Sequence, residues 1–284
     1  MMEFTLLTGF LAAALRIATP LLFAATGELV AERAGVLNLG IEGAMLAGAL
    51  TAALVGTAYG PGAGVVAAVA AGALCGLVVA LVAVRARADQ VITGTAVTLG
   101  AVGLTGAIYR ATLGSGGSPQ ALKTLEWPWA LSAVALLAVP CVWWILYRTR
   151  WGLALRAAGE DRQAAAANGV PVERIQTSAL LIAGAFAGLG GATLVLAQVG
   201  SFAEKMTAGR GFVAIAIVVL GRWSPFGVLA AAVLFGALQA LQFLLQGMGL
   251  DLPYQLFLVL PYVFTLLALA GLVGRARAPA GLGK

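Results

Sequence analysis

Apolar stretches of about 20 residues recur along the whole chain, and each is long enough to cross a membrane as a helix. Helices satisfy their own backbone hydrogen bonds in lipid, and these stretches lack the alternating pattern of a barrel strand. We therefore predict an all-α polytopic membrane protein with about 8–10 transmembrane helices, folded as one domain over residues 1–284. The predicted spans are residues 4–26, 36–56, 62–84, 91–110, 128–147, 177–198, 211–222, 226–247 and 252–273, of which 211–222 is too short to cross alone.

The composition excludes most other classes of function. Hydrophobic residues make up 61% of the 284 and charged residues only 10%, which leaves no room for a soluble catalytic domain. No lysine lies in the glycine-rich frame of a phosphate-binding loop, so the chain is not expected to hydrolyse ATP itself. The sequence has no histidine, and Cys75 and Cys141 lie in separate apolar stretches, which favours small core residues over a metal site. We expect no enzyme activity, no metal and no cofactor.

Basic residues in short loops indicate the cytoplasmic side of a membrane protein. If the loop at 85–90 is inside, twelve basic residues fall inside: Arg33, Arg85, Arg87, Arg148, Arg150, Arg156, Arg162, Arg174, Arg222, Arg275, Arg277 and Lys284. Only four fall outside, namely Arg110, Lys123, Lys205 and Arg210. This distribution predicts a cytoplasmic C-terminus. Arg16 lies near the middle of the first predicted span, where a charge must pair, snorkel or face protein.

The largest loop, residues 147–176, is predicted to be cytoplasmic and to couple the chain to a partner. Glu160 and Asp161 are expected in the first turn of a short helix, where acidic side chains favour the positive end of the dipole. An alanine run follows, and Gly169 with Pro171 forms a stop signal. A mere linker needs only a few residues, although a solvated connection is the alternative. The charge for docking would come from Arg148, Arg150, Arg156 and Arg162.

Two short segments interrupted by glycines, residues 35–48 and 207–227, lie in opposite halves of the chain. Broken helices in matching positions are typical of translocation paths, because freed backbone groups need protein or water against them. Close packing through small residues is the alternative. Asn38 and Glu42 are spaced to share one helix face, and Glu42 is the only carboxylate expected at membrane depth. We predict that these two side chains line or shape the inner part of a substrate path.

Five motifs carry a resemblance to a known family. They are "ERAGVLNLGIEG", "ADQVITGTAVTLGAVGLT", "RTRWGLALRAAGED", "MTAGRGFVAIAIVVLGRWSPFGVLAAAVLFGALQALQ" and "LPYVFTLLAL". Together they resemble the permease subunit of bacterial ABC importers for nucleosides and simple sugars, a family related to ribose and branched-chain amino-acid permeases. The resemblance runs from about residue 18 to residue 273, in the same order and spacing.

The resemblance implies several partners and a location. They are a second related permease, a cytoplasmic ATPase with two nucleotide-binding cassettes, an extracytoplasmic substrate-binding lipoprotein and the lipid of a bacterial cytoplasmic (inner) membrane, with no nucleic acid. Thr93, Thr95 and Phe212 lie in the matching motifs and are expected in the substrate path. One departure concerns the ATPase-facing loop, where Gly169 follows an alanine run without the leading Glu or the later Leu-Pro of the widely known permease signature.

The expected function is therefore nucleoside import, with purine nucleosides as the closest pattern. A simple-sugar permease of the ribose type is the first alternative. An ion-driven transporter working alone is a second, disfavoured because the spans show no histidine and almost no carboxylates. A purely structural membrane subunit would not explain the broken helices.

Overall fold

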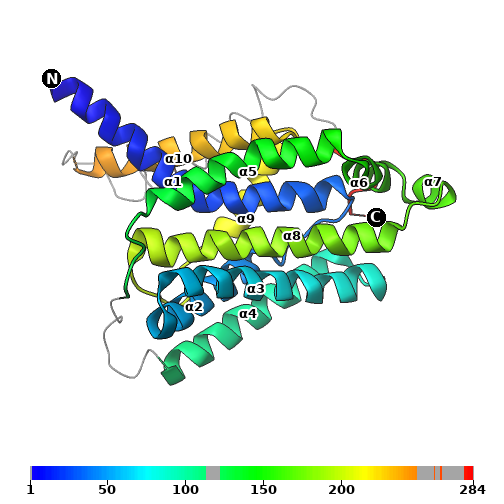
Figure 1. Cartoon of the computed structure of the whole chain (residues 1–284), viewed down its shortest axis with the longest axis horizontal. Helices are drawn as coiled ribbons and strands as arrows, with labels where there is room; N and C mark the ends of the chain where they lie inside the picture. Colours follow the sequence, from blue (N-terminus) through cyan, green and yellow to red (C-terminus); the bar gives the residue numbers. More distant parts are fainter. Residues whose placement is uncertain (1, 113–121, 248–258, 260–262, 264–277, 284) are drawn as a thin grey trace.

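The computed structural model describes residues 2–112, 122–247, 259, 263 and 278–283, and within these ranges the chain is helical with short connections (Figure 1). The helices are α1 (Met2–Arg33), α2 (Ile41–Tyr59), α3 (Pro61–Val79), α4 (Gln90–Thr112), α5 (Trp129–Arg148), α6 (Arg150–Glu160), α7 (Arg162–Ala167), α8 (Val172–Thr193), α9 (Arg210–Leu220) and α10 (Pro225–Gly247). Two π-helical stretches, η1 (Ala80–Arg85) and η3 (Leu194–Val199), extend α3 and α8.

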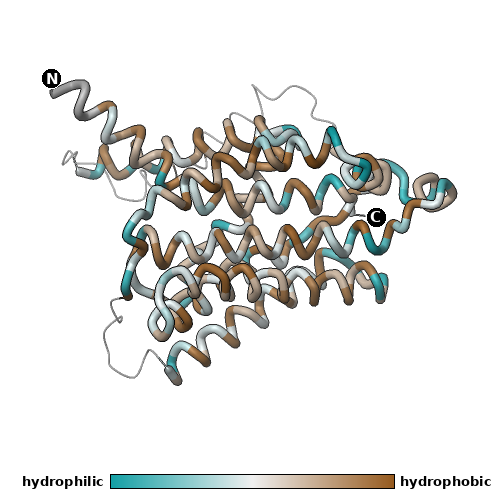
Figure 2. The backbone as a smooth tube through the Cα atoms, viewed as in Figure 1, coloured by the Kyte–Doolittle hydropathy of each residue, from teal (hydrophilic) through white to brown (hydrophobic). Residues whose placement is uncertain are grey.

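The predicted membrane fold is confirmed. Among the described residues, seven helices are long and apolar enough to cross a membrane, and α9, with 11 residues, is the predicted short one. Figure 2 shows apolar residues along the helices and polar segments concentrated towards their ends, as expected for a bundle in lipid. The span predicted at 252–273 lies outside the described residues apart from two isolated positions.

Helix α1 is the central element of the bundle. It packs against α5, α8, α9 and α10, and residues 18–32 are buried without a break. A helix that is enclosed on all sides needs small and apolar side chains all round, which this part of the sequence supplies. The predicted end at residue 26 is wrong, because the helix continues to Arg33 and takes two glutamates into the protein interior.

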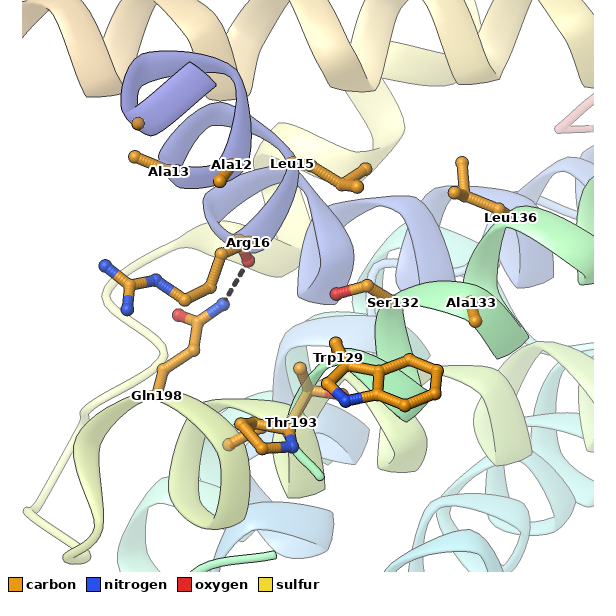
Figure 3. A pocket seen from close by; sticks show the side chains of 13 residues that line it. Ala12, Ala13, Leu15, Arg16, Trp129, Ser132, Ala133, Leu136, Thr193 and Gln198 are labelled. Carbon is orange, nitrogen blue, oxygen red and sulfur yellow. Dashed lines mark hydrogen bonds between the residues drawn. The ribbon is translucent and has the colours of Figure 1, made fainter. Parts of the chain in front are cut away.

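A proline shapes the N-terminal half of α1. Pro20 has no N–H, so the carbonyl of Arg16 loses its partner four residues further along the helix. The side-chain amide of Gln198, in η3, donates a hydrogen bond to that carbonyl instead (Figure 3). The bond links α1 to the end of α8 at the point where the helix would otherwise be weakest.

Helices α3 and α8 approach each other through glycines. A Cβ atom built on Gly72 would lie 2.1 Å from the carbonyl oxygen of Gly184, and one on Gly184 would lie 2.2 Å from the carbonyl oxygen of Gly72. One turn further along, a Cβ on Gly188 would lie 2.1 Å from the carbonyl oxygen of Ala68. In lipid, helix association depends on such close backbone packing because burial of apolar surface gives little driving force.

One end of the bundle gathers the predicted cytoplasmic elements. Helices α6 and α7 and the C-terminal residues lie together at this end, with the N-terminus at the other (Figure 1). The amide of Gly281 donates to the carbonyl of Gly159, 2.9 Å away, which ties the C-terminal segment to α6. Arg33 also lies here, donating from Nε to the carbonyl of Trp223 at 2.7 Å. Arg210, predicted to lie outside, is the first residue of α9 and is half-buried.

Candidate functional site

The connection between α1 and α2 is an unwound segment, residues 34–40, that folds back along α1. The Asn38 amide donates to Glu28 Oε1 at 3.0 Å, and Glu28 lies more than a helical turn before the end of α1. Helix α2 therefore begins inside the bundle rather than at its end. The predicted interruption near 35–48 is confirmed, with α2 starting at Ile41.

Side chains satisfy the backbone of this unwound segment. Gln90 Oε1 accepts from the Leu37 backbone amide at 2.8 Å, and Thr98 Oγ1 donates to the Leu39 carbonyl at 2.9 Å. Asn38 Oδ1 accepts from the Gly40 amide at 3.1 Å, which forms a local turn. Irregular backbone is tolerated at membrane depth only with such partners.

The second unwound segment, residues 200–209, enters from the opposite end. At its start the Gly200 carbonyl accepts from the Leu122 amide at 2.8 Å, and further along Glu204 pairs with Arg110 near the end of α4 at 3.2 Å. Helix α9 then continues from Arg210 to Leu220. Its 11 residues span roughly 16 Å, about half of the hydrocarbon layer.

Glu42 joins the two unwound segments. Its Oε1 accepts hydrogen bonds from the Thr207 hydroxyl at 2.6 Å and the Gly209 amide at 2.9 Å, and its Oε2 accepts from the Gly211 amide at 2.6 Å. The side chain is buried, with 6% of the residue exposed. A Cβ on Gly211 would lie 2.5 Å from the Glu42 Cα, so only glycine permits this approach. We call Glu42, Thr207, Gly209 and Gly211 the Glu42 junction.

The segment 200–220 crosses the bundle as an unwound half followed by a helical half. After α9, a turn brings Trp223 to the end of α1, where its indole N–H donates to Glu32. The backbone is strained on both sides of α9, since Ala208 before it has φ 47° and Trp223 after it has φ 51°, values unfavourable for residues with a side chain. The sequence leaves open whether residues 211–222 cross or turn back. The Glu204 pair with Arg110 before α9 and the Trp223 contact with Glu32 after it show that the longer stretch, unwound segment and α9 together, runs between the two ends of the bundle.

Two sequence-based interpretations of this site are wrong. Asn38 and Glu42 do not share a helix face, because Asn38 precedes α2 and only Glu42 lies in its first turn. Glu42 is also not the only buried carboxylate, since Glu28 is 0% exposed and Glu32 is 1% exposed. Glu28 and Glu32 were missed because charges near the expected end of the first span were assigned to the membrane surface. Their four-residue spacing, which continues the helical periodicity of α1, was the available signal.

Of the other residues predicted in the substrate path, Thr93 is buried, whereas Thr95 and Phe212 are exposed. Thr93 is buried and its hydroxyl donates to the Asp89 carbonyl at 2.7 Å, which stabilises the start of α4. Thr95 is exposed on α4, and Phe212, on the first turn of α9, is 45% exposed. Both elements pack against the first turn of α2: a Cβ on Gly43 would lie 2.9 Å from the Thr98 Cα. Thr95 and Phe212 therefore belong to helices that flank the Glu42 junction.

The predicted coupling loop contains two helices rather than one. Asp161 caps α7 by accepting hydrogen bonds at 2.9 Å from the amides of Gln163 and Ala164. Glu160 is not in that first turn, because it is the last residue of α6. Gly169 has φ +81°, the left-handed conformation typical of a helix stop.

The basic residues of this loop have different surroundings. The Arg156 side chain contacts α5 within the chain. Its Nε donates to the Leu146 carbonyl at 3.1 Å, and its guanidinium lies 4.9 Å from the ring centre of Tyr147. Arg148 lies 5.8 Å from the ring centre of Trp143, and Arg162 lies 3.9 Å from Glu173. Arg150 is the exposed first residue of α6, and Pro171 is the residue immediately before α8.

Helix α6 contacts the start of the first unwound segment. A Cβ on Gly159 would lie 2.2 Å from the Arg33 carbonyl oxygen, and one on Gly35 would lie 3.1 Å from the Gly159 Cα. Gly35 has φ +83°, so glycine is required both for the turn and for the contact. The loop helix is thus packed directly against the connection that leads to Glu42.

The chain matches the family described as "Branched-chain amino acid transport system / permease component" over residues 10–269. It is 34% identical over 290 residues to the guanosine ABC transporter permease protein NupQ of Bacillus subtilis, covering 92% of this chain and 91% of NupQ. It is 40% identical over 270 residues to the putative glucose ABC transporter permease protein TsgC13 of Haloferax volcanii, covering 86% and 80%. Nucleoside ABC transporter permease protein NupC of Lactococcus lactis is 30% identical over 289 residues, covering 92% and 91%.

No solved structure matches this chain. The family match covers most of the sequence, and the seven long apolar helices, the two unwound segments and the two-helix loop fit a multi-pass transport subunit. The chain therefore belongs to the permease components of the branched-chain amino acid transport system family, and it is an ABC importer permease, a non-catalytic transport subunit.

Proposed function

We propose that this permease carries nucleosides across a bacterial cytoplasmic membrane, along the exposed faces of α4 and α9. The observation that carries the proposal is the Glu42 junction, where two unwound segments from opposite ends of the bundle meet on one buried carboxylate. Backbone of this kind, at this depth, needs protein or water against it rather than lipid. Thr95 and Phe212 are the polar and aromatic side chains exposed beside it.

Asn38, Glu42 and Thr93 shape this path rather than line it, because all three are buried and their side chains hydrogen-bond backbone groups. The exposed faces of α4 and α9 form one wall, and a second related permease supplies the other. In that assembly each of the two cassettes of the ATPase has one coupling loop to bind, because each permease supplies one loop. An extracytoplasmic binding lipoprotein would deliver substrate at the end where α2 meets α3.

Coupling to the ATPase follows from the contacts of α6. In the proposed orientation α6, α7 and the C-terminal residues face the cytoplasm, in line with the distribution of basic residues. A push on α6 reaches Gly35 through the Gly159 contact, and the segment after Gly35 leads to Asn38 and Glu42. Movement of the loop is thereby transmitted to the junction, as alternating access requires.

Gly169→Val is expected to reduce nucleoside-stimulated ATP hydrolysis several-fold while the complex still assembles. Valine at φ +81° costs about 1–3 kcal/mol of backbone strain, and the added side chain projects from an exposed position on the proposed docking surface. The measurement is guanosine-stimulated ATP hydrolysis by the reconstituted complex of permeases, ATPase and binding protein.

Gly169→Asn is the matched control, because asparagine tolerates the left-handed conformation and stays polar. It should retain most of the stimulation. If Gly169→Val leaves both assembly and stimulation unchanged, the loop only fixes topology and does not couple. An absence of guanosine stimulation in the unmodified complex would contradict nucleoside transport itself.

A simple-sugar substrate is the second candidate. It is favoured by the 40% identity to a relative named as a putative glucose permease, whereas NupQ and NupC are named for guanosine and nucleosides. The aromatic side chain of Phe212 suits a flat base, which favours nucleosides. Glu28 and Glu32 weaken the sequence argument against an ion-driven transporter, but family membership favours ATP as the energy source.

A further inference from the structure

A groove lies between the N-terminal half of α1, the start of α5 and the end of α8 with η3 (Figure 3). It has a volume of about 570 Å³, and its wall is mostly apolar, with four alanines and two leucines among the lining residues. Its few polar side chains are Arg16, Ser132, Thr193 and Gln198, and Trp129 closes one side. The groove is separate from the Glu42 junction, none of whose residues lines it.

Arg16 is the only charged side chain in the groove, and it is exposed. Among the described residues, no carboxylate lies within 4.0 Å of its guanidinium, since the ion pairs found there involve other arginines. The side-chain amide of Gln198 donates a hydrogen bond to the backbone carbonyl of Arg16 and not to the Arg16 side chain. An unpaired guanidinium against apolar walls favours an anion from outside the chain.

The groove lies at the level of a membrane interface. Trp127 and Trp129 stack with ring centres 6.2 Å apart, and each is 65% exposed, as in the aromatic belts of membrane proteins. Arg16 is roughly 25 Å along α1 from Arg33, close to the thickness of the hydrocarbon layer. With Arg33 at the inner boundary of this layer, as the distribution of basic residues predicts, Arg16 is near the outer boundary and not at the centre of the layer.

We propose that this groove binds an anionic phospholipid, with the lipid phosphate on Arg16 and an acyl chain along the alanine and leucine walls. Guanidinium groups bind phosphate oxygens in a bidentate manner, and the Trp129 indole N–H can donate to the glycerol or phosphate region. A single carboxylate from a neighbouring permease would neutralise Arg16 but leave most of the volume empty. A nucleoside would offer no charge for Arg16 and would have to bind apolar walls.

The test is native mass spectrometry of the purified transporter complex, released from nanodiscs that contain equal parts of palmitoyl-oleoyl-phosphatidylglycerol and palmitoyl-oleoyl-phosphatidylcholine. The wild type should retain phosphatidylglycerol in preference to phosphatidylcholine. Arg16→Gln should lower that preference about fivefold, since one basic residue contributes about 1 kcal/mol to anionic lipid binding. Arg16→Lys should keep part of it. Arg110→Gln is the matched control, because Arg110 is already paired with Glu204.

Ala133→Leu provides a second variant, which narrows the groove without changing charge. It should lower retention of both lipids at this site, and it keeps the proposal testable if Arg16→Gln does not fold. An unchanged preference in Arg16→Gln, or unchanged retention in Ala133→Leu, would overturn the proposal. Displacement of the lipid by guanosine would identify a substrate site instead. Loss of the second permease from Arg16→Gln in both lipids would identify a protein contact instead.

Discussion

Glu42→Ala is expected to lower nucleoside uptake by about tenfold or more per molecule of permease in the membrane. The substitution leaves the Thr207 hydroxyl and the Gly209 and Gly211 amides without their acceptor in a buried site. Each buried donor without a partner costs about 1–3 kcal/mol, so the second unwound segment should leave its position before the whole bundle unfolds. The measurement is uptake of labelled guanosine, normalised to membrane-embedded protein.

Two further variants separate the junction from a general effect of charge. Glu42→Gln keeps one acceptor oxygen but places an NH2 group, itself a donor, against at least one of the three donors. Guanosine uptake by this variant should therefore fall between that of the wild type and that of Glu42→Ala. Glu126→Ala removes an exposed carboxylate and should transport like the wild type. Normal uptake by Glu42→Ala would show that the Glu42 junction has no role in transport.

Gly184→Val is expected to prevent folding of the bundle. The new side chain would meet backbone of α3, with its Cβ 2.2 Å from the Gly72 carbonyl oxygen, and backbone cannot rotate away as a side chain can. Helices α3 and α8 would have to separate along their length, with loss of the close packing that holds them together in lipid. We expect little monodisperse protein after extraction in mild detergent and size-exclusion chromatography.

Gly103→Val is the matched control for helix propensity. Gly103 is in the interior of α4, where a Cβ would meet nothing within 4 Å. The β-branched side chain therefore brings the same propensity effect without the steric clash. A normal, monodisperse yield of Gly184→Val would contradict the α3–α8 packing described above.

Apolar periodicity was sufficient to predict most of the helices. The span predicted at 91–110 is α4, residues 90–112, and the span predicted at 226–247 is α10, residues 225–247. Membrane helices can be predicted in this way because length and hydrophobicity are imposed by the bilayer itself. The same length argument predicted that α9 is too short to cross alone, since 11 helical residues cannot span the hydrocarbon layer.

The candidate site was only partly predictable, because its partners are far apart in the sequence. The sequence singles out Glu42 as a carboxylate among apolar residues, but its acceptor role depends on Thr207, 165 residues away, and on two backbone amides that carry no sequence signal. Asn38 was placed on a helix because spacing alone cannot show that the Asn38 backbone bonds Glu28 instead. Non-local hydrogen bonds thus decided the points on which local patterns failed.

We propose that this permease imports nucleosides with energy from a separate ATPase. The most direct measurement is uptake of labelled guanosine into proteoliposomes that contain this chain, a second related permease, the two-cassette ATPase and the binding lipoprotein. We predict uptake only when ATP and the ATPase are both present, with unlabelled adenosine competing strongly and unlabelled ribose or glucose competing weakly. Uptake by this chain without the ATPase, or equal competition by glucose or ribose, would contradict the account.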